Sequence, residues 1–176
     1  MPKKKSLQTR LARVKLLLCD VDGVLTDGTV LFGDGKEYKR FSIQDGLGML
    51  LLKQNGVRVG WVSNRPSAVT KQRAEELKID FLFQEKGNKV KAVELILQQS
   101  GAAWDEVCFM GDDVVDLGAL KRAGVAVAVA NAIPEAKAMA HYVTKARGGQ
   151  GAVREVVIMI LKAQKQWAKL IRHFSC

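Results

Sequence analysis

Two aspartates, Asp20 and Asp22, stand two residues apart where the apolar run Val14–Cys19 ends, and Gly23 follows at once. An apolar run that ends in acidic residues is typical of a buried parallel strand that delivers a site at its carboxyl edge. One carboxylate at such a point would serve as a helix cap. Two carboxylates on alternate positions indicate chemistry, because they offer a nucleophile or metal ligand beside a general acid.

Three further groups of polar residues follow predicted strands. They are Ser63-Asn64-Arg65, the lysines Lys86, Lys89 and Lys91, and Gly111-Asp112-Asp113 with Asp116 one helical turn later. Because the carboxyl ends of parallel strands meet at one edge of a sheet, we expect these groups to lie around Asp20. Acidic residues that cluster without histidine or cysteine favour a hard cation, and Mg²⁺ is the usual one. Its ligands would be Asp20, Asp112 and either Asp113 or Asp116.

Each group also has an ordinary structural interpretation. Ser63 and Asn64 would cap a helix, Lys89 would be surface charge, and Asp112 and Asp113 would occupy a helix N-terminus. The occurrence of all four groups, including Asp20 and Asp22, in this order at strand ends favours phosphoryl-transfer chemistry over these structural interpretations.

In that chemistry a carboxylate attacks phosphorus to form an aspartyl-phosphate, while the cation and a lysine neutralise the phosphoryl oxygens. Ser63 donates a hydrogen bond to one of these oxygens, and Asp22 exchanges protons with the leaving oxygen and the water. Of the three lysines we select Lys89, because it begins the next predicted helix.

The hydrophobic pattern alternates strands and helices. Strands are predicted at 14–19, 57–63, 81–83, 107–110 and 125–129, and helices at 45–54, 67–77, 89–99, 114–122, 135–140 and 152–174. Alternation of this kind predicts an α/β fold with a Rossmann-like parallel sheet and helices on both faces. We expect a basic N-terminal tail over residues 1–13 and a single domain over residues 14–176.

Two segments stand outside the alternation. Residues 29–43 hold two β-prone runs around Gly33-Asp34-Gly35, which predicts an inserted hairpin. Because an isolated hairpin is marginal in water, it is expected to pack on something, such as a neighbouring subunit. Residues 152–174 form a long amphipathic pattern interrupted at Gln164. This helix is expected to close one side of the sheet, and its basic outer turns leave a subunit or membrane-surface contact as the alternative.

The composition limits the class of protein. The chain has 176 residues, 48% of them hydrophobic and 6% aromatic, and a net charge of +10. This charge suits an anionic substrate, but no aromatic residues interleave with the basic ones, so we expect no nucleic-acid binding. The cysteines Cys19, Cys108 and Cys176 form no even framework, and the first apolar run is too short for a signal peptide. A cytoplasmic location follows as an expectation.

The strand-end motifs resemble those of the haloacid dehalogenase superfamily of aspartate-nucleophile phosphohydrolases. The resemblance runs from Leu16 to about Glu155 and includes DVDGVLTDG, VSN, the lysine region and GDDVVD. It implies that Asp20 is the nucleophile and Asp22 the acid/base. It also implies that Mg²⁺ is held by the Asp20 carboxylate, the Asp22 backbone carbonyl and Asp112. Ser63 and Lys89 would bind phosphate, and Asp113 and Asp116 would support the metal ligands.

Within that superfamily the chain resembles the 3-deoxy-D-manno-octulosonate 8-phosphate phosphatases. The resemblance rests on the hairpin that leaves no room for a cap domain, on Gln44-Asp45-Gly46, and on the segment Arg147–Glu155. It implies a homotetramer in which the hairpins meet centrally, and a role in lipopolysaccharide synthesis. The expected substrate-binding residues are Asn64, Arg65, Asp45 and Arg147.

The chain departs from that family's pattern in its second motif. Ser63-Asn64-Arg65 stands where the family has Thr-Gly-Arg, so Asn64 adds a side chain near the substrate. Arg65 suits a sugar-acid carboxylate, whereas a relative that acts on a nine-carbon sialic-type phosphate has glutamate there. A nine-carbon sugar acid phosphate, another small phosphomonoester, or a non-catalytic scaffold role remain the alternatives.

Overall fold

The central sheet contains six strands within residues 6–175, the part of the chain that this computed structural model describes. From one edge to the other they are β5 (Phe81–Gln84), β4 (Arg58–Ser63), β1 (Leu16–Cys19), β6 (Val107–Gly111), β7 (Val125–Ala128) and β8 (Tyr142–Val143). Each neighbouring pair runs parallel, and β1 lies between β4 and β6. The predicted α/β fold with a Rossmann-like sheet is confirmed. Strand β8 was not predicted, because two residues are too few to show alternation.

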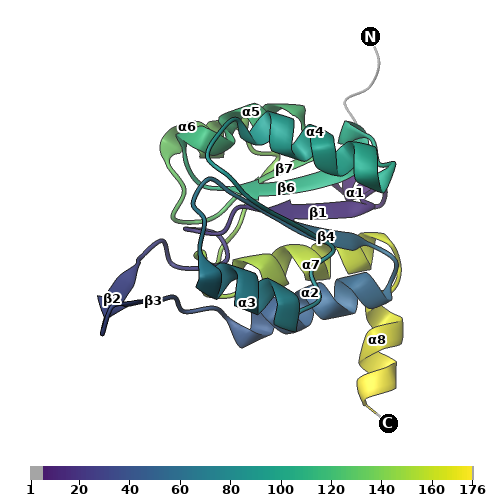
Figure 1. The fold of residues 1–176 in the computed structure, drawn as a ribbon. Helices are drawn as coiled ribbons and strands as arrows, with labels where there is room; N and C mark the ends of the chain where they lie inside the picture. Colours follow the sequence, from purple (N-terminus) through teal and green to yellow (C-terminus); the bar gives the residue numbers. More distant parts are fainter. Residues whose placement is uncertain (1–5, 176) are drawn as a thin grey trace.

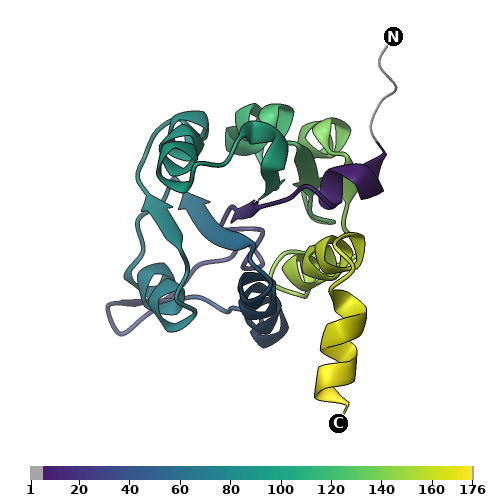
Figure 2. The ribbon, with the colours of Figure 1, turned by 90° about the vertical axis from the view of Figure 1, so that its right-hand side faces the viewer.

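Helices cover both faces of the sheet (Figure 1). One layer holds α4 (Lys89–Ser100), α5 (Leu117–Arg122) and α6 (Pro134–Met139), and the other holds α2 (Ile43–Gln54), α3 (Ala68–Glu76) and α7 (Ala152–Ala163). Figure 2 shows the strands between these two layers. Strands β1, β6 and β7 are buried throughout, which explains why they read as continuous apolar runs rather than alternating ones.

The predicted helix over 114–122 is divided in the structure. Its first turn, η2 (Val114–Asp116), is a 3-10 turn in which the Asp116 amide donates to the Asp113 carbonyl at 2.9 Å. The α-helix α5 begins only at Leu117. A second 3-10 turn, η1 (Trp104–Glu106), precedes β6. Short 3-10 turns of this kind are common at helix ends, where they redirect the chain.

Part of the expected basic tail is helical. Residues Leu7–Leu11 form α1, which Ser6 caps by accepting a hydrogen bond from the Thr9 amide. Leu11 is buried, and Arg10 donates to the Gly124 carbonyl at 2.8 Å. The N-terminal segment therefore packs on the domain from residue 7 onward. Residues 1–5 of the expected tail lie outside the described residues.

The predicted hairpin is present. Strands β2 (Leu31–Gly33) and β3 (Lys36–Tyr38) pair antiparallel. Asp34 and Gly35 connect them with φ angles of 49° and 70°, the positive values that a type I′ turn requires. Figure 1 shows the hairpin projecting from the edge of the domain where the strands end.

The prediction of one continuous helix over 152–174 was wrong. The chain forms α7 and then a separate helix, α8 (Trp167–Phe174), which points away from the domain in Figure 2. Lys165 adopts a left-handed conformation with φ 59°, and its amide donates to the Lys162 carbonyl at 3.0 Å. The Gln166 amide donates to the Leu161 carbonyl at 2.8 Å. These two bonds form a Schellman motif, which ends a helix.

The interruption in the apolar pattern at Gln164 marks this helix end. Its side-chain amide donates to the Val14 carbonyl at 2.7 Å, so the polar residue serves a buried backbone group. No helix in residues 6–175 is long and apolar enough to cross a membrane. The alternative that the outer turns contact a membrane surface stays a hypothesis.

The left-handed residue at the end of α7 allows a test of this helix end. We expect Lys165→Gly to raise the free energy of unfolding by about 0.5–1 kcal/mol, because glycine adopts positive φ without the steric cost that lysine has. Lys162→Gly, in the last turn of α7, is the matched control and should lower it by about 1 kcal/mol. Urea denaturation of both variants measures the two effects. A destabilised Lys165→Gly variant would contradict the assigned helix end.

Candidate active site

The site is a cavity at the carboxyl edge of the sheet. Because β1 lies between β4 and β6, the residues that follow these three strands meet there, together with the start of α4. The cavity has a volume of about 190 Å³ and is lined by Asp20, Asp22, Ser63, Asn64, Arg65, Lys89, Asp112, Asp113 and Val115. Most of the residues singled out in the sequence therefore lie in one place. Lys86 and Lys91 are exposed, whereas Lys89 is buried in the site.

Lys89 is at the centre of the charged groups. Its Nζ lies 2.7 Å from Asp20 Oδ1 and 2.7 Å from Asp116 Oδ1, and the Lys89 and Asp116 side chains are 1% and 0% exposed. Burial lowers the pKa of Lys89, but the charges of the two carboxylates outweigh that effect and raise it above its ordinary value. The lysine is therefore held as a cation between the two acids.

Asp20 is buried, and Lys89 offsets only part of the effect of that burial on its carboxylate. Its Oδ1 accepts a hydrogen bond from the Val21 amide at 2.7 Å. Burial and the charge of Asp116 raise the pKa of Asp20 to about 6, against the lowering effect of Lys89. One ammonium group is therefore not enough to stabilise all the negative charge at this edge of the sheet.

The carboxylates of Asp20, Asp112 and Asp116 form an oxygen cluster that fits a divalent cation. One oxygen of each lies within 4.8 Å of the others. Asp112 Oδ1 is buried and has no hydrogen-bond partner among residues 6–175. Burial and the charges of Asp20 and Asp116 raise the pKa of Asp112 to about 8. A hard cation such as Mg²⁺ would satisfy that oxygen and offset the repulsion.

Asp116 also shapes the loop that carries Asp112. Its Oδ2 accepts hydrogen bonds from the amides of Asp112 and Asp113, at 2.9 and 3.2 Å. Asp113 is exposed, and its Oδ1 accepts from the Val114 amide at 2.7 Å. Asp116 therefore joins the loop of Asp112 to Lys89, with which it forms an ion pair. Its expected role in supporting the metal ligands stays a prediction.

The Asp22 carboxylate lies outside the oxygen cluster. Its Oδ1 is 2.7 Å from Lys39 Nζ, and its Oδ2 is 3.3 Å from Arg65 Nε. Arg65 also pairs with Glu37. Lys39 and Glu37 are residues of the site that the sequence motifs did not indicate. The signal available was their spacing of two at the end of the hairpin, which directs both side chains to the same face. The metal contact expected from the Asp22 backbone carbonyl stays a prediction.

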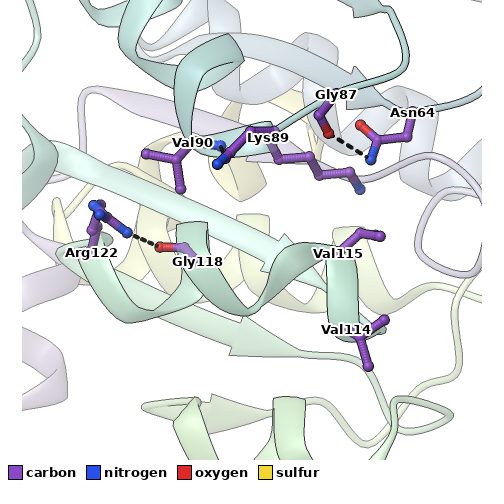
Figure 3. Close-up of a pocket in the computed structure, with 9 residues that line it drawn as sticks. Asn64, Gly87, Lys89, Val90, Val114, Val115, Gly118 and Arg122 are labelled. Atoms are coloured by element: carbon purple, nitrogen blue, oxygen red, sulfur yellow. Dashed lines mark hydrogen bonds between the residues drawn. The ribbon is translucent and has the colours of Figure 1, made fainter.

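The second motif forms a tight turn at the end of β4. Ser63 Oγ accepts a hydrogen bond from the Arg65 amide at 3.1 Å, and Ser63 is buried. Asn64 Nδ2 donates to the Gly87 carbonyl at 3.0 Å, which joins this turn to the segment before α4. Figure 3 shows this bond beside Lys89, which extends from the first turn of α4.

A second cavity adjoins the site. It has a volume of about 520 Å³, lies between the start of α4 and the η2–α5 segment, and shares Asn64, Lys89 and Val115 with the first cavity. Arg122 lies at its far end in Figure 3, where it donates to the Gly118 carbonyl.

Asp45 does not line the active-site cavity, and its expected contact with substrate stays a prediction. Asp45 is buried, and its two carboxylate oxygens accept hydrogen bonds from the amides of Arg154, at 2.7 Å, and Gly151, at 3.2 Å. Both amides belong to the start of α7, so Asp45 joins α2 to α7. Arg147 is exposed on the loop before α7 and does not line the cavity described above. Its expected contact with substrate stays a prediction.

The glycine-rich segment 147–151 supports the loop of Asp22 through hydrogen bonds. The Gly149 amide donates to the Val24 carbonyl at 3.0 Å, and the Gly148 amide donates to Asn131 Oδ1 at 2.6 Å. Asn131 in turn donates to the Gly23 carbonyl at 3.0 Å. A side chain at Gly148 would collide with that carbonyl, so the close approach of the two backbones requires glycine.

Comparison with known proteins agrees with this geometry. A family model for haloacid dehalogenase-like hydrolases matches residues 76–156. The 3-deoxy-D-manno-octulosonate 8-phosphate phosphatase of Yersinia pestis is 39% identical over 156 residues, which is 88% of this chain and 83% of that protein. The protein of the same name from Escherichia coli K12 is 35% identical over 93% of this chain and 87% of its own length.

Solved structures extend the similarity to the whole fold. The same phosphatase from Moraxella catarrhalis, in complex with magnesium, phosphate and 3-deoxy-D-manno-octulosonate (KDO), superposes with a TM-score of 0.92 at 37% identity and covers 95% of this chain and 97% of that one. A hypothetical protein from Xanthomonas campestris gives a TM-score of 0.93 at 39% identity, over 100% of this chain and 97% of that one. The chain belongs to the 3-deoxy-D-manno-octulosonate 8-phosphate phosphatase family of haloacid dehalogenase-like hydrolases.

Proposed function

We propose that this chain is a Mg²⁺-dependent phosphatase that hydrolyses 3-deoxy-D-manno-octulosonate 8-phosphate to KDO and phosphate, a step toward lipopolysaccharide. The proposal rests on the buried Asp20–Lys89–Asp116 network beside Asp112 Oδ1, which has no hydrogen-bond partner in the described part of the chain. The identity of 35–39% to phosphatases of this name, and the magnesium, phosphate and KDO in the Moraxella structure, support the substrate and the metal.

In the first half-reaction an Asp20 carboxylate oxygen attacks phosphorus, and the bond from phosphorus to the sugar oxygen breaks. Asp22 gives its proton to that leaving oxygen, so the sugar departs as an alcohol. Lys89 and Ser63 bind the phosphoryl oxygens during the transfer. The product of this step is an aspartyl-phosphate on Asp20.

In the second half-reaction water attacks the same phosphorus. The Asp22 carboxylate, now deprotonated, takes a proton from the water, and the bond from phosphorus to the Asp20 oxygen breaks. Phosphate leaves, and Asp20 and Asp22 return to their starting states. Asp22 therefore serves as acid and then as base, which requires that its carboxylate stay in one position.

Asp20, Asp112 and the Asp22 backbone carbonyl would hold Mg²⁺, with Asp113 and Asp116 supporting them. When bound, Mg²⁺ neutralises charge on the phosphoryl group and helps to orient it. The residues of this chain provide the nucleophile, the proton and the remaining positive charge.

Arg65 and Asn64 are the residues that we assign to substrate selection. The Arg65 guanidinium is partly exposed at the cavity and suits the carboxylate of a sugar acid, which it can bind through two parallel hydrogen bonds. Asn64 lines the same cavity.

We further propose that the enzyme acts in the cytoplasm. This location is consistent with the buried thiols of Cys19 and Cys108, neither of which forms a disulfide in the described part of the chain.

We also propose that the protein assembles as a homotetramer through the hairpin at residues 29–43. Leu31 and Phe32 are 63% and 78% exposed, and Tyr38 lies with them on the same two strands. Apolar side chains of this size on a short, otherwise unpaired hairpin favour burial against another copy.

The function and its nucleophile are tested together by phosphate release. We expect the wild-type protein with Mg²⁺ to release phosphate from 3-deoxy-D-manno-octulosonate 8-phosphate faster than from a panel of sugar phosphates that includes a nine-carbon sugar acid phosphate. Asp20→Asn should reduce this rate by at least about a thousandfold, because it removes the nucleophile. Asp105→Asn, an exposed acid beside Arg13, is the matched control and should leave the rate unchanged. Release of phosphate only from other sugar phosphates would contradict the proposed substrate. An active Asp20→Asn variant would refute the mechanism.

The metal site is tested by stability as well as by activity. A saturating concentration of Mg²⁺, about one hundred times its dissociation constant, should stabilise the wild-type protein by about 2.7 kcal/mol. Asp112→Asn should lose most of this stabilisation, because it removes a ligand and part of the charge. Thermal unfolding with Mg²⁺ and with chelator measures both. Equal stabilisation of the two proteins would show that Asp112 does not bind the metal.

The assembly is tested by sedimentation velocity. We expect the wild-type chain to sediment as a tetramer and Phe32→Asp to sediment as a smaller species, because the substitution places a charge in the apolar contact. Lys121→Gln, on the exposed side of α5, lowers the net charge by the same one unit and should remain a tetramer. A wild-type monomer would contradict this assembly.

A further inference from the structure

The end of the hairpin brings a buried cation into the active site. Lys39 follows β3, and its side chain is 0% exposed. Its Nζ lies 2.7 Å from Asp22 Oδ1, 3.1 Å from Thr70 Oγ1 and 3.8 Å from Glu37 Oε1. A lysine is almost never fully buried unless it is paired, so this position reflects a specific contact rather than general surface charge.

Asp22 is held from two sides. Lys39 contacts one of its carboxylate oxygens, and Arg65 contacts the other at 3.3 Å. Glu37 joins the two cations, because it pairs with Arg65 and lies 3.8 Å from Lys39. The carboxylate thus has a defined orientation, although it lies on a loop after β1.

The two cations that contact Asp22 differ in the exposure of their side chains. The Arg65 side chain is 38% exposed, faces the cavity, and is the group assigned above to the substrate's carboxylate. The Lys39 side chain is 0% exposed, and its Nζ also donates to Thr70 at the start of α3. When substrate engages Arg65, Lys39 is the partner that remains on Asp22.

We propose that Lys39 is a positioning residue for Asp22, holding its carboxylate where it can exchange a proton with the leaving oxygen and then with water. This inference rests on the proposed function, in which Asp22 is the acid and base. Proton transfer requires Asp22 within hydrogen-bond reach of the leaving oxygen as the bond from phosphorus breaks. Because Lys39 belongs to the hairpin, the placement of the hairpin also sets the placement of the acid.

Two substrates with different leaving groups distinguish this positioning role from a purely structural one. A sugar alkoxide is a strong base and must be protonated as it departs, whereas p-nitrophenolate leaves from phosphorus without a proton. Formation of the aspartyl-phosphate should therefore depend on Asp22 for the sugar phosphate and much less for p-nitrophenyl phosphate. Hydrolysis of the aspartyl-phosphate needs Asp22 as a base in both cases.

The experiment is rapid-quench kinetics with Lys39→Met in Mg²⁺, using 3-deoxy-D-manno-octulosonate 8-phosphate and p-nitrophenyl phosphate. We expect the burst rate for release of KDO to fall by about one hundredfold, the usual contribution of a positioned acid. The burst rate for nitrophenolate should stay within about twofold of wild type and be followed by a slow steady phase. The burst amplitude counts the folded, active sites, so partial misfolding does not alter the comparison of rates.

Two further variants complete the design. Lys39→Gln retains a hydrogen-bond donor toward Asp22 and should fall between wild type and Lys39→Met. Lys71→Met makes the same substitution at an exposed lysine of α3, next to Thr70, and should match wild type. Equal slowing of both bursts in Lys39→Met would overturn the proposal in favour of a structural role, and so would two unchanged bursts. A wild-type protein that releases neither product would instead contradict the proposed function.

Discussion

The ion pairs of Lys89 are the interaction on which the site depends. Lys89 Nζ lies 2.7 Å from a carboxylate oxygen of Asp20 and 2.7 Å from one of Asp116, and all three side chains are almost fully buried at the carboxyl edge of the sheet. An isolated charge in such a place would cost several kcal/mol, and the acids could not stay together without a cation between them. The remaining imbalance appears in the raised pKa values of Asp20 and Asp112, and it is the physical reason why this edge of the sheet favours a divalent metal.

The rest of the fold brings those charges together and keeps their loops in place. Asp20 follows the central strand, Asp112 follows its neighbour on one side, and Ser63 ends its neighbour on the other. The Asp116 carboxylate orders the loop of Asp112, and the Gly148–Gly149 segment with Asn131 supports the loop of Asp22. The conspicuous C-terminal glycine motif therefore acts on the site through the backbone.

The hairpin carries two sets of side chains with different roles. Leu31 and Phe32 are exposed apolar side chains, which suit a contact between subunits. Glu37 and Lys39 instead contact Arg65 and Asp22 in the site. One short insertion thus links the proposed assembly surface to the acid/base group, because both sets of residues move with the same pair of strands.

The sequence by itself determined the architecture and the main chemical groups. Buried parallel strands are visible as continuous apolar runs, and the acids, serine and lysine at their ends must meet, because parallel strands end at one edge. That reasoning located Asp20, Asp22, Ser63, Lys89 and Asp112, and it selected Lys89 among three nearby lysines.

Only the tertiary structure decided which side chains partner which. Asp45 lies in a motif that resembles a substrate contact, yet its oxygens bind backbone amides of α7, which lies more than one hundred residues away along the chain. No sequence motif singled out Lys39, which pairs with Asp22. At the end of α7, Gln164 donates to the Val14 carbonyl, 150 residues away along the chain. The local sequence pattern indicates which residues are buried and whether a segment is a helix or a strand. These contacts arise between segments that are distant in sequence, so no local pattern predicts them.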